Sequence, residues 1–467
     1  MITLHEGDNR ISLRRLIDEG VRVHSVVTDP PYGLVSIQKR FGKEGAAPAR
    51  TERNDGSFAR LSGGFMGRAW DATGIERDPE FWRLIWEILL PGGYVFAFSG
   101  SRTGHWQACA METAGFIMHP MHGWVFGSGF PKAHAADKAI DKHFGAERID
   151  LGQSPNWRES KRNREVNGSM EVRGENAGRI TAPATPEAQQ WEGWAYGTQA
   201  QKPALEPIYL GQKPFSEKTG AANILKHGVG AVNIDGCRVP TEDNLNGGAY
   251  AQNPTQRAEM WGEEAGNSWK RGGAGEYQQP VGRHPANLIH DGSAEVLALF
   301  PSGTSGKPGV RRKVATSNSM SGPLNMTGET EVGYADSGSA ARFFNSFQPD
   351  PDPIFYHPKA GKEDRAGSKH PTVKPIALMQ HLIRHITPPG GVVLDPFAGT
   401  GTTAEAARRE GFDCILMEAE PEYAEFLRSR FEIEDCDDLS DLLGPFDQKI
   451  AAAQPNESQD PLLELLG

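Results

Sequence analysis

The chain has 467 residues, enough for one large core or two modest ones, and its 55 Gly and 33 Pro favour an α/β protein with long loops. It has no run of about 18 apolar residues and no signal-peptide layout at its start, so we expect a cytoplasmic protein without a membrane partner. The net charge is −11, but residues 431–467 hold ten acids and one lysine, net −9, which leaves −2 for residues 1–430. A wholly basic protein is thereby excluded, whereas a local positive face is not.

Short apolar runs in the first 132 residues predict buried strands at Ile2–Leu4, Val23–Thr28, Tyr94–Ser99 and Gly123–Phe126. The segment DPEFWRLIWEILLPGG (78–93) has helical apolar spacing, an Asp-Pro start and a Pro-Gly-Gly stop, which together predict a helix. Residues 34–75 are Gly-rich and are predicted to form a long loop.

The stretch VVTDPPYGLV (26–35) carries the first candidate site. A predicted strand runs into Asp29, Pro30, Pro31 and Tyr32, and the prolines fix φ near −65°. The turn would therefore hold a carboxylate and an aromatic ring rigidly at the end of a strand. The simpler interpretation is an ordinary strand-terminating turn, which Asp-Pro often forms.

Composition divides the rest of the chain. Residues 133–205 are predicted to be a basic, loop-rich insertion, and 206–214 a strand that returns to the sheet. Residues 215–345 mix short apolar pieces with Gly, Asn and Ser runs. Dense α/β patterning returns in 346–434, and the acidic tail 435–467 is predicted to be mobile.

The segment VVLDPFAGTGTTAEAA (392–407) predicts a strand, a Gly-rich turn and a helix, with Glu418 at the end of the following strand. A dinucleotide site fits poorly, because Ala404 stands where a third glycine is expected. Only 49 residues follow Glu418, too few to complete the fold, so the N-terminal half must supply the missing strands. The predicted sheet is thus circularly permuted, with Asp8 beside Glu418. A nucleoside without phosphate, such as S-adenosylmethionine, fits this site better than NAD.

These motifs resemble the amino-directed DNA methyltransferases, which methylate N6 of adenine or N4 of cytosine. DPPY precedes FxGxG here, as in the β group of the family. HPTVKPIALMQHLIR (370–384) is similar to the cofactor-binding element before FxGxG, and GWVFGSGFPK (123–132) to the Trp-and-Lys element. The segments AANILKHGVGAVNIDGCRV and PANLIHDGSAEVLALFP resemble bacterial and phage-borne orphan methyltransferases. The resemblance covers roughly residues 1–132 and 203–430.

The resemblance implies a Rossmann-like S-adenosylmethionine-dependent sheet in two halves. Residues 1–132 would form the catalytic half, 215–345 the inserted target-recognition region, and 346–434 the cofactor-binding half. Asp29 and the Pro30 carbonyl would accept hydrogen bonds from the target amine, and Tyr32 would stack on a flipped base. The implied cofactor-binding residues are Asp8, Asn9, Asp29, Thr372, Lys374, Pro375, Asp395, Pro396, Phe397, Ala398, Gly399, Thr400, Gly401, Thr402, Thr403 and Glu418. Lys374 could instead cap the helix that follows it.

Double-stranded DNA is the expected partner. Basic clusters would meet its phosphates, with Lys132, Arg158, Lys161, Arg162, Arg164, Arg311, Arg312 and Lys313 as candidates. Each cluster could equally be an ordinary solvated loop. Family relatives are often dimers, so a homodimer is expected by analogy alone. A companion restriction nuclease cannot be determined from the sequence.

Other functions remain open at this point. Cytosine-N4 methylation shares the mechanism, although those enzymes more often carry Ser where Asp29 stands. RNA or protein-amide methylation uses similar turns, and a catalytically dead DNA-binding relative should have eroded motifs, which are intact here. Cytosine-C5 chemistry needs a Pro-Cys nucleophile, and no proline precedes any of the four cysteines, Cys109, Cys237, Cys414 and Cys436. They also form no CxxC motif, so we expect no metal site.

Overall fold

The computed structural model describes residues 1–33, 73–127, 129, 131–154, 179–241, 281–304, 309–312, 329–332, 337–347, 366 and 373–433. Most of the predicted loop 34–75, the basic cluster 158–164 and all of the tail 435–467 lie outside these residues. Within these ranges, no helix has the length and apolar character needed to cross a membrane.

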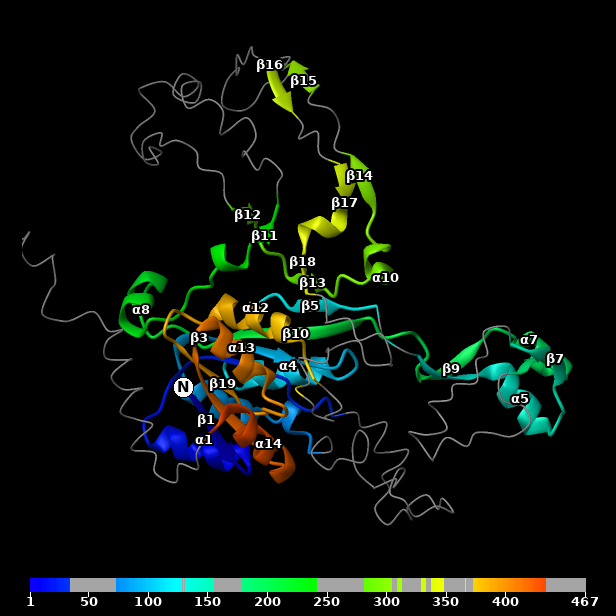
Figure 1. The fold of residues 1–467 in the computed structure, drawn as a ribbon, viewed down its shortest axis with the longest axis horizontal. Coiled ribbons are helices and arrows are strands. Elements are labelled where there is room, and N and C mark those ends of the chain that lie inside the picture. Colours follow the sequence, from blue (N-terminus) through cyan, green and yellow to red (C-terminus); the bar gives the residue numbers. More distant parts are fainter. Residues whose placement is uncertain are drawn as a thin grey trace, which may run out of the picture.

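One sheet of ten strands forms the body of the molecule (Figure 1). Its order is β1-β20-β19-β2-β3-β10-β5-β13-β18, and β4 pairs with β10. The strands are β1 (Ile2–Glu6), β20 (Asp413–Glu418), β19 (Val392–Asp395), β2 (Val23–Thr28), β3 (Leu89–Phe98), β10 (Leu205–Gln212), β5 (His122–Val125), β13 (Leu288–His290), β18 (Asn345–Ser346) and β4 (Ile117–Met118). The first five on this path run parallel, whereas β10 is antiparallel to both β3 and β5.

The C-terminal strands β19 and β20 thus lie between the N-terminal strands β1 and β2. The predicted α/β sheet built from both ends of the chain is confirmed. The circular permutation relative to other methyltransferases stays a prediction.

Helices cover both faces of the sheet. The first core cluster contains α1 (Asn9–Asp18), α3 (Pro79–Ile88) and α4 (Gly104–Thr113), and the second contains α12 (Ile376–Ile386), α13 (Thr402–Glu410) and part of α14 (Pro421–Phe431). Strand side chains alternate between them: Val26 belongs to the first cluster and Val27 to the second, as do Ile415 and Leu416. Apolar residues therefore stand at successive positions of these strands, because neither face of the sheet meets water.

The helix predicted over 78–93 is shorter than expected. It starts at Pro79, capped by the Asp78 side chain, but ends at Ile88, and β3 begins at Leu89. Pro91, Gly92 and Gly93 therefore lie within the strand and not at a helix stop. The strand is irregular there, because Val23 pairs with Leu89 but Ser25 with Tyr94. Gly92 has φ 90°, which a β-branched or bulky residue would not adopt readily.

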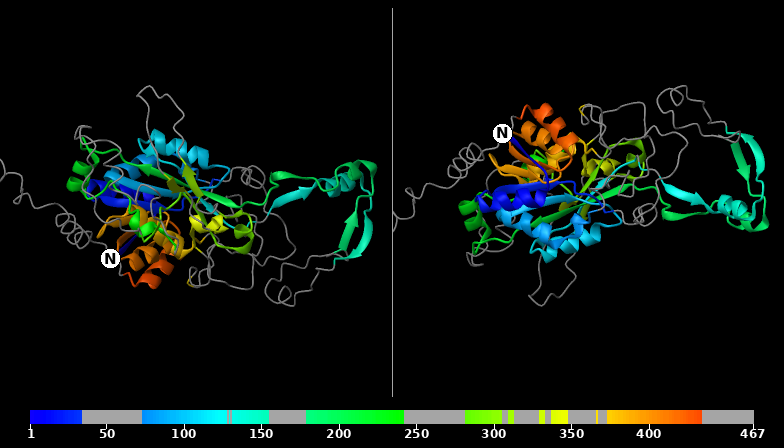
Figure 2. Two further views of the ribbon diagram at one scale, coloured as in Figure 1. Left: turned by 90° about the horizontal axis from the view of Figure 1, so that it is seen from above. Right: turned by 90° about the horizontal axis from the view of Figure 1, so that it is seen from below.

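Residues 131–154 and 179–199 form an arm that projects from the body (Figures 1 and 2). Its described part is more regular than the loop-rich insertion that we predicted. It contains β6 (Lys132–Ala135), α5 (Ala136–Phe144), β7 (Ile149–Gln153), β8 (Arg179–Ala182), α7 (Pro186–Gln190) and β9 (Ala195–Gln199). Arg148 holds the arm together by pairing with Asp137 and Asp141, both at 2.7 Å. At least one basic residue of the arm, Arg148, thus stabilises the fold of the arm itself.

The region after β10 forms a lobe beside the far edge of the sheet (Figure 1). It contains η4 (Asp235–Cys237), β11 (Val239–Pro240), β12 (Gly282–Arg283), α10 (Ala294–Leu297), β14 (Ser302–Thr304), β15 (Gly309–Arg312), β16 (Glu329–Val332), β17 (Ser337–Ser339) and η7 (Ala340–Phe343). Helix α8 (Gly220–His227) precedes it on the body, and η3 (Ile75–Arg77) lies against α4. Strands β13 and β18 tie the lobe directly into the main sheet.

Candidate functional site

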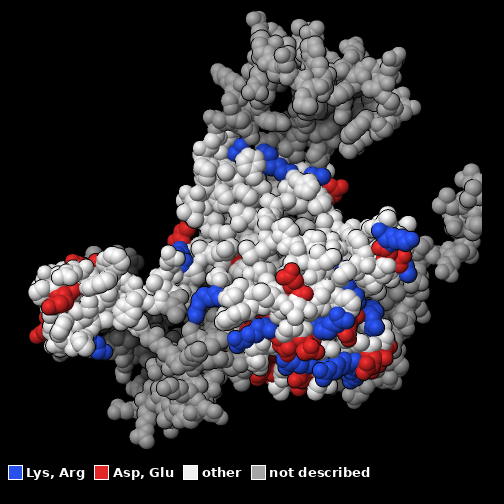
Figure 3. All heavy atoms as spheres, turned by 180° about the vertical axis from the view of Figure 1, so that it is seen from behind, with Lys and Arg blue, Asp and Glu red and all other residues white. Residues whose placement is uncertain are grey.

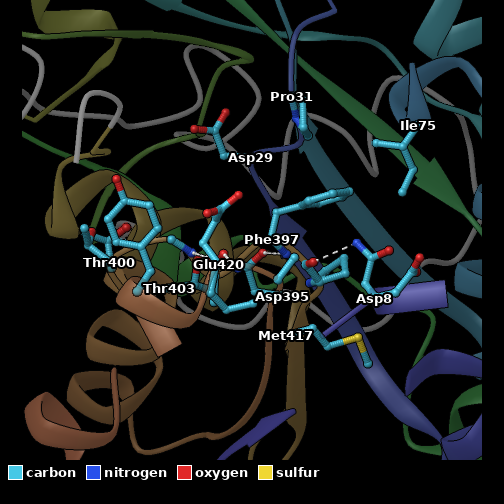
Figure 4. Close-up of a pocket in the computed structure, with 18 of the residues that line it drawn as sticks. Asp8, Asp29, Pro31, Ile75, Asp395, Phe397, Thr400, Thr403, Met417 and Glu420 are labelled. Carbon is cyan, nitrogen blue, oxygen red and sulfur yellow. Dashed lines mark hydrogen bonds between the residues drawn. The ribbon is translucent and has the colours of Figure 1, made fainter. Parts of the chain in front are cut away.

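A cavity of about 290 Å³ lies at the carboxyl ends of β1, β2, β19 and β20 (Figure 4). Ligands of open α/β sheets bind at this edge. Of the predicted residues, the cavity is lined by Asp8, Asn9, Asp29, Pro31, Lys374, Asp395, Pro396, Phe397, Ala398, Gly399, Thr400, Thr402, Thr403 and Glu418. Two distant motifs, the DPPY turn and the Gly-rich turn, thus meet at one site.

Asp395, at the end of β19, accepts hydrogen bonds from three residues around the site. Its Oδ1 accepts from Thr28 Oγ1 at 2.7 Å and from the Phe397 amide at 3.1 Å, and its Oδ2 accepts from Thr403 Oγ1 at 2.5 Å. Burial raises the pKa of this carboxyl to about 6, because the charged form is desolvated. Asp395 thereby locks the turn after β19 against the end of β2.

The turn between β19 and α13 needs glycine at two positions. Gly399 has φ 55° and Gly401 φ 75°, a left-handed conformation that L side chains rarely adopt. A Cβ on Gly401 would also lie 2.6 Å from side-chain atoms of Leu427 and Phe431. The first two glycines of the sequence motif are therefore required by the backbone itself.

Glu418 faces this turn from the end of β20. Its Oε2 accepts from the Gly399 amide at 2.8 Å and its Oε1 from the Glu420 amide at 2.9 Å. Burial raises the pKa of the Glu418 carboxyl to about 7, and the nearby charges of Asp395 and Glu420 add to the rise. Each oxygen keeps a further lone pair for a hydroxyl group in the cavity.

The DPPY turn holds a buried charged cluster. Lys374 Nζ forms an ion pair with Asp29 Oδ2, donates to the Tyr32 hydroxyl at 3.1 Å and lies 3.8 Å from Glu206 Oε2. The lysine ammonium also lies 4.7 Å from the centre of the Phe98 ring. Burial, with the Asp29 charge beside it, raises the pKa of Tyr32 well above its usual value, so the phenol stays protonated.

Asp29 Oδ1 is buried and has no hydrogen-bond partner in the ranges that the structure describes. Such an acceptor is costly to leave open, so a donor in the bound state is expected to reach it. The turn itself is rigid, because Thr103 Oγ1 donates to the Tyr32 carbonyl at 2.6 Å. In Figure 4, Asp29 and Pro31 lie at the top of the cavity view, with Asp8 and Met417 below.

Asp8 caps the start of α1, a role that was not predicted from the sequence. Its side chain caps α1 by accepting from the Arg10 amide at 2.8 Å. It nevertheless lines the cavity, and the parallel pairing of Glu6 with Glu418 brings it beside that residue. Asn9 Nδ2 donates to the Pro396 carbonyl at 3.0 Å, which joins the start of α1 to the turn after β19.

The other predicted site residues lie elsewhere or are not described. Pro375 caps α12, and Gly401 begins α13 without lining the cavity. Lys374 precedes that cap and turns into the charged cluster instead of capping the helix. Lys132 lies on β6, and Arg311 and Arg312 on β15, with only their backbones described. Outside the described residues are Thr372, Arg158, Lys161, Arg162, Arg164 and Lys313.

The cavity also contains residues that the sequence analysis missed. These are Gly7, Arg10, Thr73, Ile75, Met379, Met417, Ala419, Glu420 and Tyr423. Gly7, Arg10, Ala419 and Glu420 adjoin predicted residues, so proximity in sequence could have found them. Ile75, Met379 and Tyr423 carry no motif, because their only distinction is an apolar side chain that the fold brings to the cavity.

Residues 216–429 match the N6_N4_Mtase family model, whose description is DNA methylase. This range is therefore similar to a domain of the DNA methylase family. The domain contains the Gly-rich turn, Lys374 and Glu418, and its sheet is completed by β1, β2 and β3 from outside the matched range. The resemblance to amino-directed DNA methyltransferases is thereby confirmed, without its subgroup.

The curated proteins that are similar to this chain include two Type II methyltransferases. The Type II methyltransferase M2.DpnII of Streptococcus pneumoniae is 42% identical over 73 residues, 16% of this chain and 27% of that enzyme. The Type II methyltransferase M.HindIII of Haemophilus influenzae is 24% identical over 282 residues, 56% of this chain and 74% of that enzyme. The chain thus spans about a quarter of the first relative's length.

Solved structures of two further methyltransferases also match. The M1.HpyAVI–SAM complex is 13% identical with a TM-score of 0.35, over 92% of this chain and 100% of that one. The PvuII DNA methyltransferase, described as cytosine-N4-specific, is 14% identical with a TM-score of 0.35, over 96% and 93% of the two chains.

Proposed function

We propose that the protein transfers a methyl group from S-adenosylmethionine to the exocyclic N6 of an adenine flipped out of duplex DNA. One observation carries this proposal. Asp29 Oδ1 is buried without a hydrogen-bond partner among the described residues, and the Asp29 carboxylate lines the same cavity as Glu418. A methyl acceptor at Asp29 and a nucleoside at Glu418 would therefore share one space. The matched DNA methylase family supports the reaction class.

The cavity suits the parts of S-adenosylmethionine. Glu418 can accept hydrogen bonds from two ribose hydroxyls, since each of its oxygens uses only one backbone amide. Phe397, Ile75 and Met417 provide apolar walls for the adenine ring. The matching M1.HpyAVI structure was solved as a SAM complex.

Charge argues against a phosphate-bearing cofactor. Five acids line the cavity: Asp8, Asp29, Asp395, Glu418 and Glu420. Of its two cations, Lys374 pairs with Asp29, and Arg10 pairs with Asp78 at 2.8 Å. Polyphosphate would be repelled, whereas a sulfonium cation would be attracted.

Methyl transfer needs an amine whose lone pair is freed from the ring. In our proposal the base amine donates one hydrogen bond to Asp29 Oδ1 and a second to the Pro30 carbonyl, which draws the nitrogen toward tetrahedral geometry. The nitrogen attacks the methyl carbon, the carbon–sulfur bond breaks, and S-adenosylhomocysteine leaves as a neutral thioether. The methylated amine then loses one proton to the Asp29 carboxylate or to water.

The choice of adenine rests on the DPPY motif. Cytosine-N4 enzymes more often have Ser in place of Asp29, yet the PvuII neighbour acts on cytosine N4, so cytosine is the alternative. The Type II names of the relatives support a place in restriction–modification, with duplex DNA as the partner. The β-group assignment and the division of the chain into catalytic, recognition and cofactor-binding parts belong to the same proposal.

DNA would meet the surface outside the cavity. On the face drawn in Figure 3, Lys and Arg lie interspersed with Asp and Glu over the body. The arm offers exposed aromatic rings instead: Trp191 and Trp194 are 46% and 62% exposed and pack edge to face at 5.4 Å. Such rings suit stacking on displaced bases.

Cofactor affinity should depend on pH through Glu418. Its pKa of about 7 means that the carboxylate is mostly ionised at pH 8 and mostly protonated at pH 6. Because the ionised form accepts hydroxyl hydrogen bonds more strongly, we expect Kd for S-adenosylmethionine to rise about tenfold from pH 8 to pH 6. Titration calorimetry at the two pH values measures this.

A Glu418→Gln variant is the control, because it keeps the shape of the side chain and removes its titration. We expect a flat Kd between pH 6 and pH 8 in this variant. A wild-type Kd that does not change with pH, or a variant that keeps the full change, contradicts the role of Glu418.

The reaction itself is tested by expressing the protein in a host without its own DNA methylation and sequencing the genome by a single-molecule method. N6-methyladenine in one short sequence context, absent with Asp29→Ala, is the expected result. Methylcytosine would keep the mechanism and overturn the base assignment. An unmodified genome, despite folded protein that binds S-adenosylmethionine, would overturn DNA as substrate and leave RNA, protein or a catalytically dead relative.

A further inference from the structure

Three buried metal-ligating side chains meet beside α12. His381 and His385 are one helical turn apart on α12, and Cys237 comes from η4 of the inserted region. One ligand atom from each lies within 4.8 Å of the other two. Spacing of i and i+4 places two side chains on the same face of a helix, as two-histidine metal sites require.

Nitrogen atoms in this cluster lack hydrogen-bond partners. His381 Nε2 and His385 Nδ1 are buried with no partner in the part of the chain that the structure describes, and so is Nδ1 of His122. The rings of His122 and His385 are 5.8 Å apart, nearly perpendicular. An unsatisfied buried polar atom costs roughly 1 to 3 kcal/mol, and three in one place are more than packing explains.

The side chains are of the kinds that bind zinc, namely imidazole nitrogens and a thiol. The Cys237 thiol donates a weak hydrogen bond from Sγ to the His381 carbonyl at 3.8 Å. A bound metal would displace the thiol proton to solvent and take the thiolate.

We propose that Cys237, His381 and His385 bind a Zn²⁺ ion, with His122 as the fourth ligand. A thiolate and three imidazoles form a closed tetrahedral set, which is typical of a structural zinc site. Tetrahedral zinc brings ligand atoms to about 3.5 Å of each other, so small side-chain rotations would bring Cys237, His381 and His385 onto one ion. The His122 ring, centred 5.8 Å from that of His385, would turn toward the same ion. The ion would join three separate segments: β5, the inserted region and α12.

The site would stiffen the active centre without touching it. Helix α12 starts two residues after Lys374, and η4 belongs to the segment that leads into the lobe. A zinc ion would therefore fix the lobe against the helix that carries Lys374 into the charged cluster. This inference does not depend on the identity of the methylated base.

The test uses the untagged full chain, because a histidine tag binds the same metals. Protein stripped with a chelator is titrated with Co²⁺, which reports its ligands by absorption. We expect one equivalent to bind, with strong tetrahedral d–d bands and a thiolate-to-cobalt charge-transfer band, both removed by Zn²⁺. We also expect Zn²⁺ to raise the Tm of the stripped protein.

Matched variants assign the ligands. Cys237→Ser should lose the charge-transfer band, and His385→Gln should weaken Co²⁺ binding at least about tenfold. Cys109→Ser and Cys414→Ser, at an exposed and a buried free cysteine, should leave both unchanged. Wild-type protein without the charge-transfer band, or Cys237→Ser that keeps it, would overturn the proposal. The wild-type titration decides even where a variant does not fold.

Discussion

Alanine in place of Asp29 is expected to lower the rate of methyl transfer about 1,000-fold, with Kd for S-adenosylmethionine within about threefold of wild type. The carboxylate oxygen Oδ1 is the open acceptor at the DPPY turn, and its removal leaves the base amine conjugated and weakly nucleophilic. Cofactor contacts at Glu418 and along the Gly-rich turn remain in place. Single-turnover kinetics on a methylatable duplex, together with calorimetry, separates the two effects.

Asp29→Asn is the sharper companion variant, because it keeps the side-chain shape and one carbonyl oxygen. We expect it to retain more activity than alanine, since an amide oxygen can still accept from the amine. Equal activity of Asp29→Ala and wild type would remove this residue from the chemistry. A Kd that rises in parallel with the loss of rate would instead make Asp29 a cofactor-binding residue.

Methionine in place of Lys374 is expected to lower the free energy of unfolding by about 3 to 5 kcal/mol. The ammonium is 6% exposed and is shared by the buried carboxylate of Asp29 and that of Glu206. Removal of one partner from a buried ion pair leaves uncompensated charge, which costs far more than loss of a surface pair. Urea unfolding followed by circular dichroism measures the change.

A double variant shows whether charge is the cause. Asp29→Asn combined with Lys374→Met should recover about 1 to 3 kcal/mol of the loss, because the unpaired carboxylate is gone. Lys226→Met is the matched control: this lysine is 60% exposed in its pair with Glu217, and its loss should cost less than about 1 kcal/mol. No recovery in the double variant would show that Lys374 acts by packing.

Local patterns in the sequence predicted much of the sheet and the core of the site. Val23–Thr28 forms β2 as expected, and the turn after β19 has the left-handed glycines that its motif implies. Both depend on short-range chemistry, namely β-branched side chains in a buried strand and glycine at positive φ. The meeting of Asp8 with Glu418 followed from counting the strands that the C-terminal half lacks.

Other features depend on contacts between distant segments, so no local pattern reveals them. The ion pair of Lys374 with Asp29 joins residues 345 positions apart. Cys237 and His381 are 144 positions apart, and their spacing matches no metal motif. The helix predicted over 78–93 ends early for a related reason. Leu89 pairs with β2 as part of a strand, although its local sequence suits a helix. Tertiary pairing thus overrides propensity.

The connection of the lobe to the sheet has a consequence for engineering. The part of the lobe that follows β13 leaves the sheet there and returns to it at β18. The two strands are parallel neighbours, with Ile289 opposite Asn345. The two ends of this part of the lobe are therefore held about 4.8 Å apart whatever lies between them. A replacement for residues 291–344 would therefore have to close the same short gap between the two strands. Junctions inside β13 or β18 would instead break the edge of the sheet. An exchange of this segment between related proteins should therefore keep both strands.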